Sequence, residues 1–218
     1  VETWGTWFRF YENGQIEMEG TTKNGKSDGE WIYWKKNGQK FIKRNYKNDE
    51  IIDEWSYYYE NHDNGNNHIV GLRKKDSSGE LIKDGVFKVF YKNGEIKENQ
   101  SYKNGKLNGY SNIFYENGHR KQRSNWVNGK VEGLVTFYYE NGFISEESTW
   151  VNGKREGSVT NYSENGRISV EGTFKDGEQN GVWTEWYENG HKKKEGISKD
   201  GEVVEIISMW NEDGSLKE

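Results

Sequence analysis

The chain has 218 residues, a formal net charge of −5 and a hydrophobic content of only 31%. The charge is spread along the whole length without a basic tail, which argues against nucleic acid as a partner. The 10 Trp, 14 Tyr and 9 Phe residues argue against disorder, and the absence of Cys excludes a disulfide framework. So small an apolar fraction predicts a thin sheet that exposes both faces rather than a deep two-layer core.

A repeat begins near the start of the chain. The pairs Asn13-Gly14 and Asn37-Gly38 lie 24 residues apart, and Asn-Gly recurs at that spacing from Gly94 to Gly190. A fixed period of this size is the signature of a repeat architecture. Aligned on their first Gly, the regular units run 5–28, 29–52, 85–108, 109–132, 133–156, 157–180 and 181–204. We therefore expect one repeat domain over 1–218, with about eight hairpin units plus a half unit.

Each unit consists of an aromatic strand, an Asn-Gly turn, a more polar strand and a second Asn-Gly turn. Asn-Gly between two strands predicts a hairpin with a type I′ turn, because both central residues of that turn need a positive φ. The chain has no Ala, which disfavours helices. The prediction is an all-β fold: an elongated, single-layer, twisted antiparallel sheet in which tandem 24-residue hairpins pair edge to edge.

Aromatic residues recur at the third and sixth positions of the first strand in each unit. In the second unit these are Trp31 and Trp34. The two positions differ in parity, so their side chains would point to opposite faces of a regular strand. Either a bulge intervenes or both faces carry an aromatic row. Cross-strand aromatic pairs of this kind contribute roughly 0.2–1 kcal/mol each and could replace a conventional core.

The third unit is irregular. It begins at Asp53, and the period is lost over 61–84 before it returns at Gly85. Insertions in repeat proteins map to loops, and such loops often lie at the binding face. Drift in a tolerant hairpin is the alternative interpretation of the same segment.

Two stretches carry a family resemblance. Asp28-Gly29-Glu30-Trp31-Ile32-Tyr33-Trp34-Lys35-Lys36-Asn37-Gly38 and Asn180-Gly181-Val182-Trp183-Thr184-Glu185-Trp186-Tyr187-Glu188-Asn189-Gly190 look like the bacterial variant of the MORN repeat. Proteins built from it are often grouped with the YwqK-type antitoxins. The resemblance covers nearly the whole chain, although Ser111, Val135 and Val159 replace the usual Trp. It implies the single-layer sheet, contact with protein or lipid, and no catalytic residues.

One local motif resembles a nucleotide-binding loop. Residues 20–27 match the Walker A pattern. A P-loop needs a helix after it, whose N-terminus holds the phosphates. Here Gly29 and Glu30 begin another strand, so we interpret the match as a repeat turn and expect no cofactor.

Two further groups could carry chemistry. His62, Asp63 and His68 could bind a metal ion, but the spacing of a calcium loop is absent and a polar loop is the preferred interpretation. Glu146 and Glu147 are strand neighbours, so their side chains point to opposite faces and cannot converge on one bond. We expect no metal site and no enzyme activity.

The expected function is that of a non-enzymatic, monomeric scaffold that binds a protein partner through exposed aromatic rows, in an antitoxin-like role. The alternative is a surface or secreted module that binds glycan or lipid. No transmembrane segment is expected; the start at Val1 favours a secreted or cell-surface protein, with the cytoplasm as the alternative. The predicted partner-binding residues flank the irregular unit: Trp31, Tyr33, Trp55, Tyr57, Tyr59, Phe87 and Tyr91.

Overall fold

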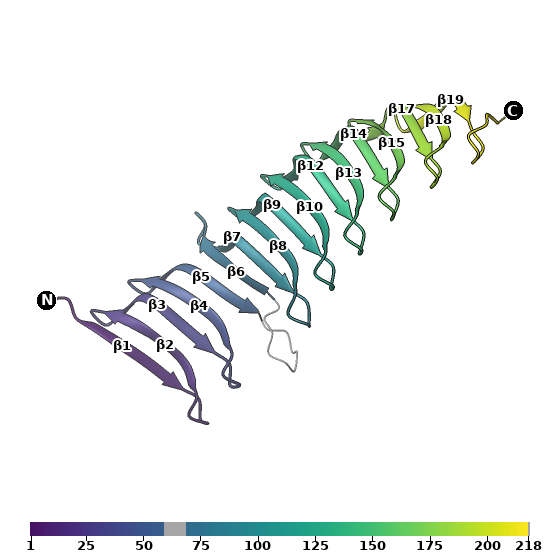
Figure 1. Cartoon of the computed structure of the whole chain (residues 1–218). Helices are drawn as coiled ribbons and strands as arrows, with labels where there is room; N and C mark the ends of the chain where they lie inside the picture. Colours follow the sequence, from purple (N-terminus) through teal and green to yellow (C-terminus); the bar gives the residue numbers. More distant parts are fainter. Residues whose placement is uncertain (59–68, 218) are drawn as a thin grey trace. The chain divides into compact units, whose positions relative to one another are not determined.

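The computed structural model describes residues 1–58 and 69–217, and of residues 55–58, 69 and 70 it describes the backbone alone. It contains 19 strands and, within these residues, no helix (Figure 1). The chain divides into two compact units, Val1–Leu107 and Asn108–Glu218. We call them unit 1 and unit 2. Whether they act as one domain, as the repeat predicts, stays a prediction.

Unit 1 contains a meander in which each strand pairs antiparallel with the next in chain order. Its strands are β1 (Trp4–Phe10), β2 (Ile16–Lys23), β3 (Lys26–Trp34), β4 (Lys40–Lys47), β5 (Glu50–Tyr58), β6 (Ile69–Lys75), β7 (Leu81–Phe90) and β8 (Ile96–Lys103). The described part of the irregular segment 61–84 is therefore β6, a turn and the start of β7. Residues 61–68 lie outside the described residues.

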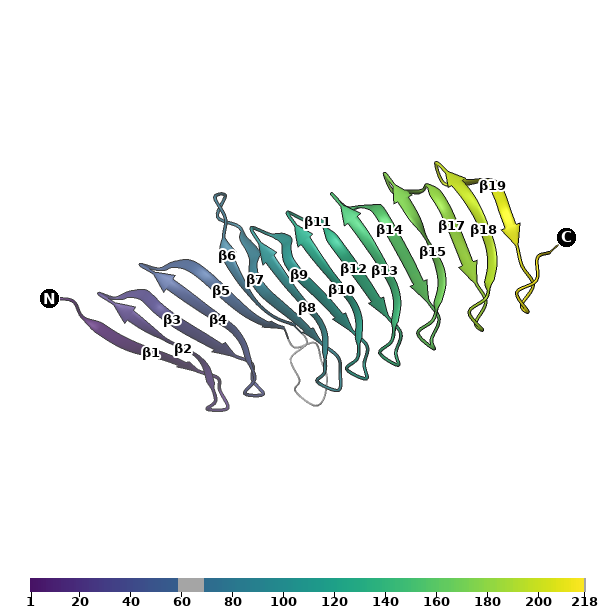
Figure 2. The same ribbon diagram turned by 45° about the horizontal axis from the view of Figure 1, so that its top comes forward.

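Unit 2 continues the same pattern from β9, whose first residues belong to unit 1 (Figure 2). Its strands are β9 (Lys106–Phe114), β10 (Arg120–Val127), β11 (Lys130–Val131), β12 (Gly133–Tyr138), β13 (Ile144–Val151), β14 (Lys154–Tyr162), β15 (Ile168–Lys175), β16 (Glu178–Gln179), β17 (Gly181–Trp186), β18 (Lys192–Lys199) and β19 (Glu202–Met209). β10 pairs with both β11 and β12, and β15 with both β16 and β17. Each of these short strands is thus the first part of an interrupted longer one. The prediction of an all-β, single-layer antiparallel sheet of tandem hairpins is confirmed.

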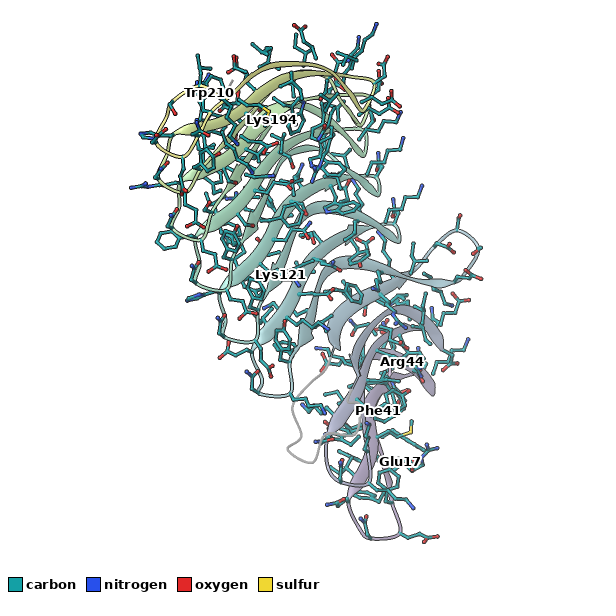
Figure 3. The ribbon with its side chains drawn as sticks, turned by 90° about the vertical axis from the view of Figure 1, so that its right-hand side faces the viewer. Glu17, Phe41, Arg44, Lys121, Lys194 and Trp210 are labelled. Carbon is teal, nitrogen blue, oxygen red and sulfur yellow. The ribbon has the colours of Figure 1, made fainter. Side chains whose placement is uncertain are left out.

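Each regular hairpin has a bulge near its first turn, on its second strand. In the second repeat Tyr33 pairs with Ile42 and Trp34 with Lys40, which leaves Phe41 without a register partner. The same shift recurs in the other regular hairpins. Because the extra residue lies on the second strand, the first strand keeps its alternation. The bulge therefore does not bring the two aromatic positions to one face, and of the two interpretations the one with aromatic residues on both faces holds. We call the side that carries Trp31 and its equivalents face A, and the opposite side face B. Side chains project from both sides of the ribbon (Figure 3).

The two turns of each repeat differ, which corrects part of the prediction. At the second Asn-Gly both residues have positive φ, as at Asn152 (52°) and Gly153 (85°), so this turn is type I′. At the first Asn-Gly only the Gly is positive, as at Gly142 (90°). There Gly142 N–H donates to the Tyr139 carbonyl at 3.0 Å. This is a type I turn followed by a left-handed Gly, the common three-residue hairpin loop.

The core is a row of side chains on face A, in which a small residue faces a large one at several strand pairs. Gly20 pairs with Trp31, Gly71 with Phe87 and Ser148 with Val159. The large members are buried, whereas a Cβ at Gly20 or Gly71 would overlap the facing ring. A single-layer sheet thus buries apolar area by laying each large side chain over the backbone of its neighbour.

Hydrogen bonds at the first turns join several repeats to the next repeat along the chain. The hydroxyls of Tyr11, Tyr115, Tyr139 and Tyr187 each donate to a backbone carbonyl 23 residues further on, at 2.6–2.9 Å. The turn Asn side chains do the same less regularly, as from Asn117 Nδ2 to the Glu140 carbonyl at 3.0 Å. The recurring Tyr-Glu-Asn-Gly of the sequence is therefore explained by folding alone.

Candidate functional site

The predicted aromatic set is divided between core and surface. Trp31 and Phe87 are only 5% and 3% exposed, so these two side chains belong to the core row. Tyr33 and Tyr91 are partly exposed. The side chains of Trp55 and Tyr57, and the whole of Tyr59, lie outside the described residues. The structure does not test whether this set binds a partner.

A polar network surrounds Tyr33 on face A of unit 1. The hydroxyls of Tyr33 and Tyr46 lie 3.0 Å apart, and the Arg44 guanidinium lies 5.1 Å from the Tyr33 ring. Burial, followed by the hydrogen bond to Tyr46, raises the pKa of Tyr33 to about 12. Burial lowers the pKa of Arg44, but its hydrogen bonds to Glu54 and Tyr46 outweigh burial and raise it.

This network replaces the Gly–aromatic pair of the core row in the irregular unit. Arg44 is in register with Glu54, and their side chains form an ion pair of 2.7 Å in which Glu54 is buried. Trp55 is consequently in register with Lys43 and not with the core-row position. The unit lacks the Gly that precedes the other first strands, because Asp53 stands there, and its register differs by one residue from that of its neighbours.

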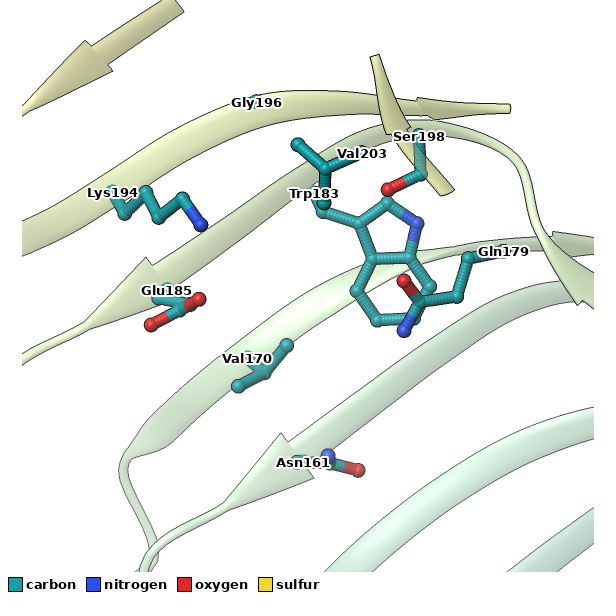
Figure 4. A pocket seen from close by; sticks show the side chains of 9 residues that line it. All are labelled: Asn161, Val170, Gln179, Trp183, Glu185, Lys194, Gly196, Ser198 and Val203. Carbon is teal, nitrogen blue, oxygen red and sulfur yellow. The ribbon is translucent and has the colours of Figure 1, made fainter. Parts of the chain in front are cut away.

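Face A of unit 2 is hollowed over several strands. One hollow of about 300 Å³ is centred on Trp183 (Figure 4). It is lined by Asn161, Val170, Gln179, Trp183, Glu185, Lys194, Gly196, Ser198 and Val203. A second hollow of about 450 Å³ is lined by Phe137, Tyr139, Ser145, Glu146, Arg155, Asn161, Tyr162 and Ser169. Asn161 lines both, so the two hollows adjoin within unit 2. Sequence reasoning missed this surface, since nothing in the repeat pattern distinguishes position 161.

Aromatic rings and hydrogen-bonding groups lie together in and beside the hollows. Phe174 and Trp183 meet edge to face at 5.3 Å, and Arg155 lies 5.2 Å from the Phe174 ring. Arg155 also pairs with Glu146 at 2.6 Å. Asn161 Oδ1 and Trp183 Nε1 are buried and have no hydrogen-bond partner within the described residues. Because buried polar atoms are normally paired, these two mark positions where polar atoms of a bound molecule would be stabilised.

The motifs that suggested other chemistry are ordinary pieces of the sheet where they are described. The Walker-like string runs from the end of β2 through a type I′ turn into β3, so no helix follows it. Among the described residues no group of three or more His, Asp or Glu side chains could hold a metal ion. His62, Asp63 and His68 lie outside these residues. No helix within the described chain is long and apolar enough to span a membrane.

The fold belongs to a recognisable class, the open antiparallel sheet built from tandem β-hairpin repeats. The model of the MORN repeat variant matches residues 5–24, 27–48, 83–104, 131–152, 155–176 and 179–200. These segments cover more than half of the chain, and the protein belongs to that family. Repeats of this kind generally mediate binding to proteins or membrane lipids, and the family is generally a non-enzymatic scaffold.

Curated proteins and solved structures give no information on function beyond the family. No curated protein matches the chain. The crystal structure of TcdB2-TccC3-TEV is 12% identical over 92% of this chain and 11% of that chain, with a TM-score of 0.33. A protein with unknown function from Bacteroides fragilis is 9% identical over 92% of this chain and 95% of that chain, with a TM-score of 0.15. The chain thus spans about a tenth of the length of the first of these, and neither likeness bears on function.

Proposed function

We propose that the protein is a non-enzymatic scaffold that holds a partner protein on face A of unit 2. The observation that carries this proposal is the pair of adjoining hollows that share Asn161, floored by Trp183, Phe137 and Arg155. Trp, Tyr and Arg are enriched among the few residues that dominate the energetics of protein interfaces. An antitoxin-like role, in which the partner is a toxin, is the particular form suggested by the family resemblance.

Charge favours a protein over a membrane surface as the partner. The chain carries a net charge of −5, which repels the anionic headgroups that attract peripheral proteins. In the hollows the carboxylates of Glu146 and Glu185 are balanced by Arg155, which pairs with Glu146, and by Lys194, so the hollows add no net positive charge. A glycan is the second candidate, because the hollow around Trp183 places an aromatic ring beside the amides of Asn161 and Gln179.

Affinity enrichment with matched charge variants tests the proposal. Glu185→Lys alters face A, whereas Glu171→Lys makes the same change on face B of the neighbouring strand. We expect at least one protein that the wild-type chain enriches to be kept by Glu171→Lys and lost by Glu185→Lys. Equal retention by both variants would contradict the proposed surface. Binding to a glycan array without any enriched protein would favour the glycan alternative.

The aromatic set in unit 1 supplies a second surface for the same experiment. Tyr33→Ala and Tyr91→Ala change two of its partly exposed members. Loss of the enriched protein with either variant, but not with Glu185→Lys, would place the partner on unit 1, as the irregular unit suggested. Circular dichroism of each variant controls for misfolding.

A further inference from the structure

Face B of unit 2 carries a line of carboxylates that the proposed function does not use. Glu147 is in register with Thr160, which is in register with Glu171. Glu171 is in register with Thr184, which is in register with Glu195. One glutamate therefore recurs on every second strand from β13 to β18. We call these five residues the Thr/Glu row.

The negative charge at the middle of the row, on Glu171, is the least neutralised by neighbouring side chains. Glu171 is exposed and makes no ion pair or hydrogen bond with the described residues. Glu147 accepts a hydrogen bond from the Tyr162 hydroxyl at 3.3 Å, and Glu195 pairs with Lys192 at 2.5 Å. Burial raises the pKa of Tyr162, and the negative charges of Glu147 and Glu171 raise it further. The row is therefore a local source of negative potential.

Two exposed apolar side chains lie beside the row. Leu134 and Val182 stand two residues before Thr136 and Thr184, and they are 57% and 51% exposed. Thr149 and Thr173 lie at the same level on two of the strands between them. Ser158 stands between Leu134 and Val182 at the same position of the repeat. A hollow of about 290 Å³ occurs there, lined in part by Ser158, Glu171 and Val182. The small side chain leaves room that leucine or valine would fill.

The spacing of the row selects one backbone conformation for a ligand. Successive glutamates are two strands apart, which is ~9.6 Å at the usual strand separation. A polyproline II helix advances ~9.3 Å in three residues and returns to the same edge. An extended strand instead repeats its side-chain direction every two residues, about 6.6–6.8 Å, which does not match.

We propose that face B of unit 2 docks a polyproline II segment of a partner protein that carries Lys or Arg at every third residue. The cationic edge of the segment lies along Glu147, Glu171 and Glu195. A second edge, formed by prolines, contacts Leu134, the hollow at Ser158 and Val182. The third edge faces solvent. This inference does not depend on the function proposed for face A.

The test uses the full chain and a labelled synthetic peptide of four Lys-Pro-Pro triplets, with binding followed by fluorescence anisotropy. The control is a peptide of identical composition with all its lysines in one block. It has the same charge as the triplet peptide and differs from it only in the spacing of the lysines. We expect the triplet peptide to bind several-fold more tightly than the block peptide, and to bind more weakly as salt is added. Glu171→Lys should raise the Kd of the triplet peptide roughly tenfold, because one ion pair is lost and a repulsion is added. Glu171→Gln should raise it less.

Glu185→Lys is the matched control, because it reverses a charge on face A of the strand next to Glu171. It should leave binding of the triplet peptide within about twofold of the wild type. Equal affinity for triplet and block peptides would overturn the proposal, since charge alone would then suffice. Equal loss with Glu185→Lys, tighter binding of a peptide with lysine at alternate residues, or no binding of any peptide would overturn it as well.

Discussion

In several strand pairs of the core row, the larger a side chain is, the smaller is the residue that faces it on the neighbouring strand. Gly172 lies beneath the Trp183 indole, whereas Ser148 faces the smaller Val159. The sequence contains this rule as pairs 11 residues apart, with Gly before Trp and Ser before Val. Spacing alone could not have revealed it, because the register that brings these residues together depends on bulges. Trp183 therefore belongs to the core row and also lines the surface hollow.

Gly172→Ala should destabilise the protein by about 1–3 kcal/mol, because its Cβ would overlap the Trp183 ring. Gly172→Ser combined with Trp183→Val recreates the Ser148–Val159 pairing. In a double-mutant cycle measured by denaturant unfolding, the double variant should be more stable than the sum of the two single changes predicts. Strict additivity would show that the two positions do not share volume.

Tyr33 should make unfolding depend on alkaline pH. Its pKa is about 12 in the folded protein against a usual value of 10.0, so the neutral side chain is favoured by folding. That contribution to stability is fully present below pH 10 and is lost as pH rises towards about 12. Denaturant unfolding across this range should show a shallower loss for Tyr33→Phe than for the wild type. Tyr110→Phe, at an exposed position, is the control, and identical slopes for all three proteins would refute the assignment.

At the scale of the element, each hairpin is determined by residues within its own repeat. The Asn-Gly pairs and the strand pattern predicted the hairpins, and the structure confirms them. The prediction that the first turn is type I′ was wrong. The preference of the Asn-Gly pair for a two-residue type I′ turn does not show that this loop has three residues. The irregular unit was recognised from the lost period. Its Arg44–Glu54 pair was not foreseen, since it depends on a register set by the absence of a Gly at position 53.

Removal of one repeat-to-repeat hydrogen bond should cost a measurable amount of stability. Tyr139→Phe deletes the bond of 2.6 Å from the tyrosine hydroxyl to the Tyr162 carbonyl. A loss of about 1 kcal/mol is expected in thermal or denaturant unfolding. Tyr110→Phe removes a hydroxyl that makes no hydrogen bond with the described residues and should change stability by a few tenths of a kcal/mol at most. Equal effects of the two changes would contradict a fastening role for the turn tyrosines.

At the scale of the whole molecule, the residues that recur from repeat to repeat explain why the chain forms a sheet. The residues that differ between repeats determine which side chains its two faces present. Tyr, Asn and Gly of the turns, and Trp, Gly and Ser of the core row, are needed for folding. Residues that vary between repeats, such as Asn161 and Glu185, line the hollows of face A. The sequence could predict the repeat and its class for this reason. It could not locate the hollows, because they arise where neighbouring repeats combine unlike side chains.

Site-specific photo-crosslinking tests the central proposal most directly. A photoreactive amino acid at position 185 would report on face A of unit 2, and the same group at Lys175, next to a type I′ turn, would report on background. After irradiation in the presence of cell extract, mass spectrometry identifies the adducts. We expect a discrete protein adduct at position 185 that is absent at position 175 and is competed by unlabelled wild-type chain. An adduct of equal yield at both positions, or none at position 185, would contradict the proposal.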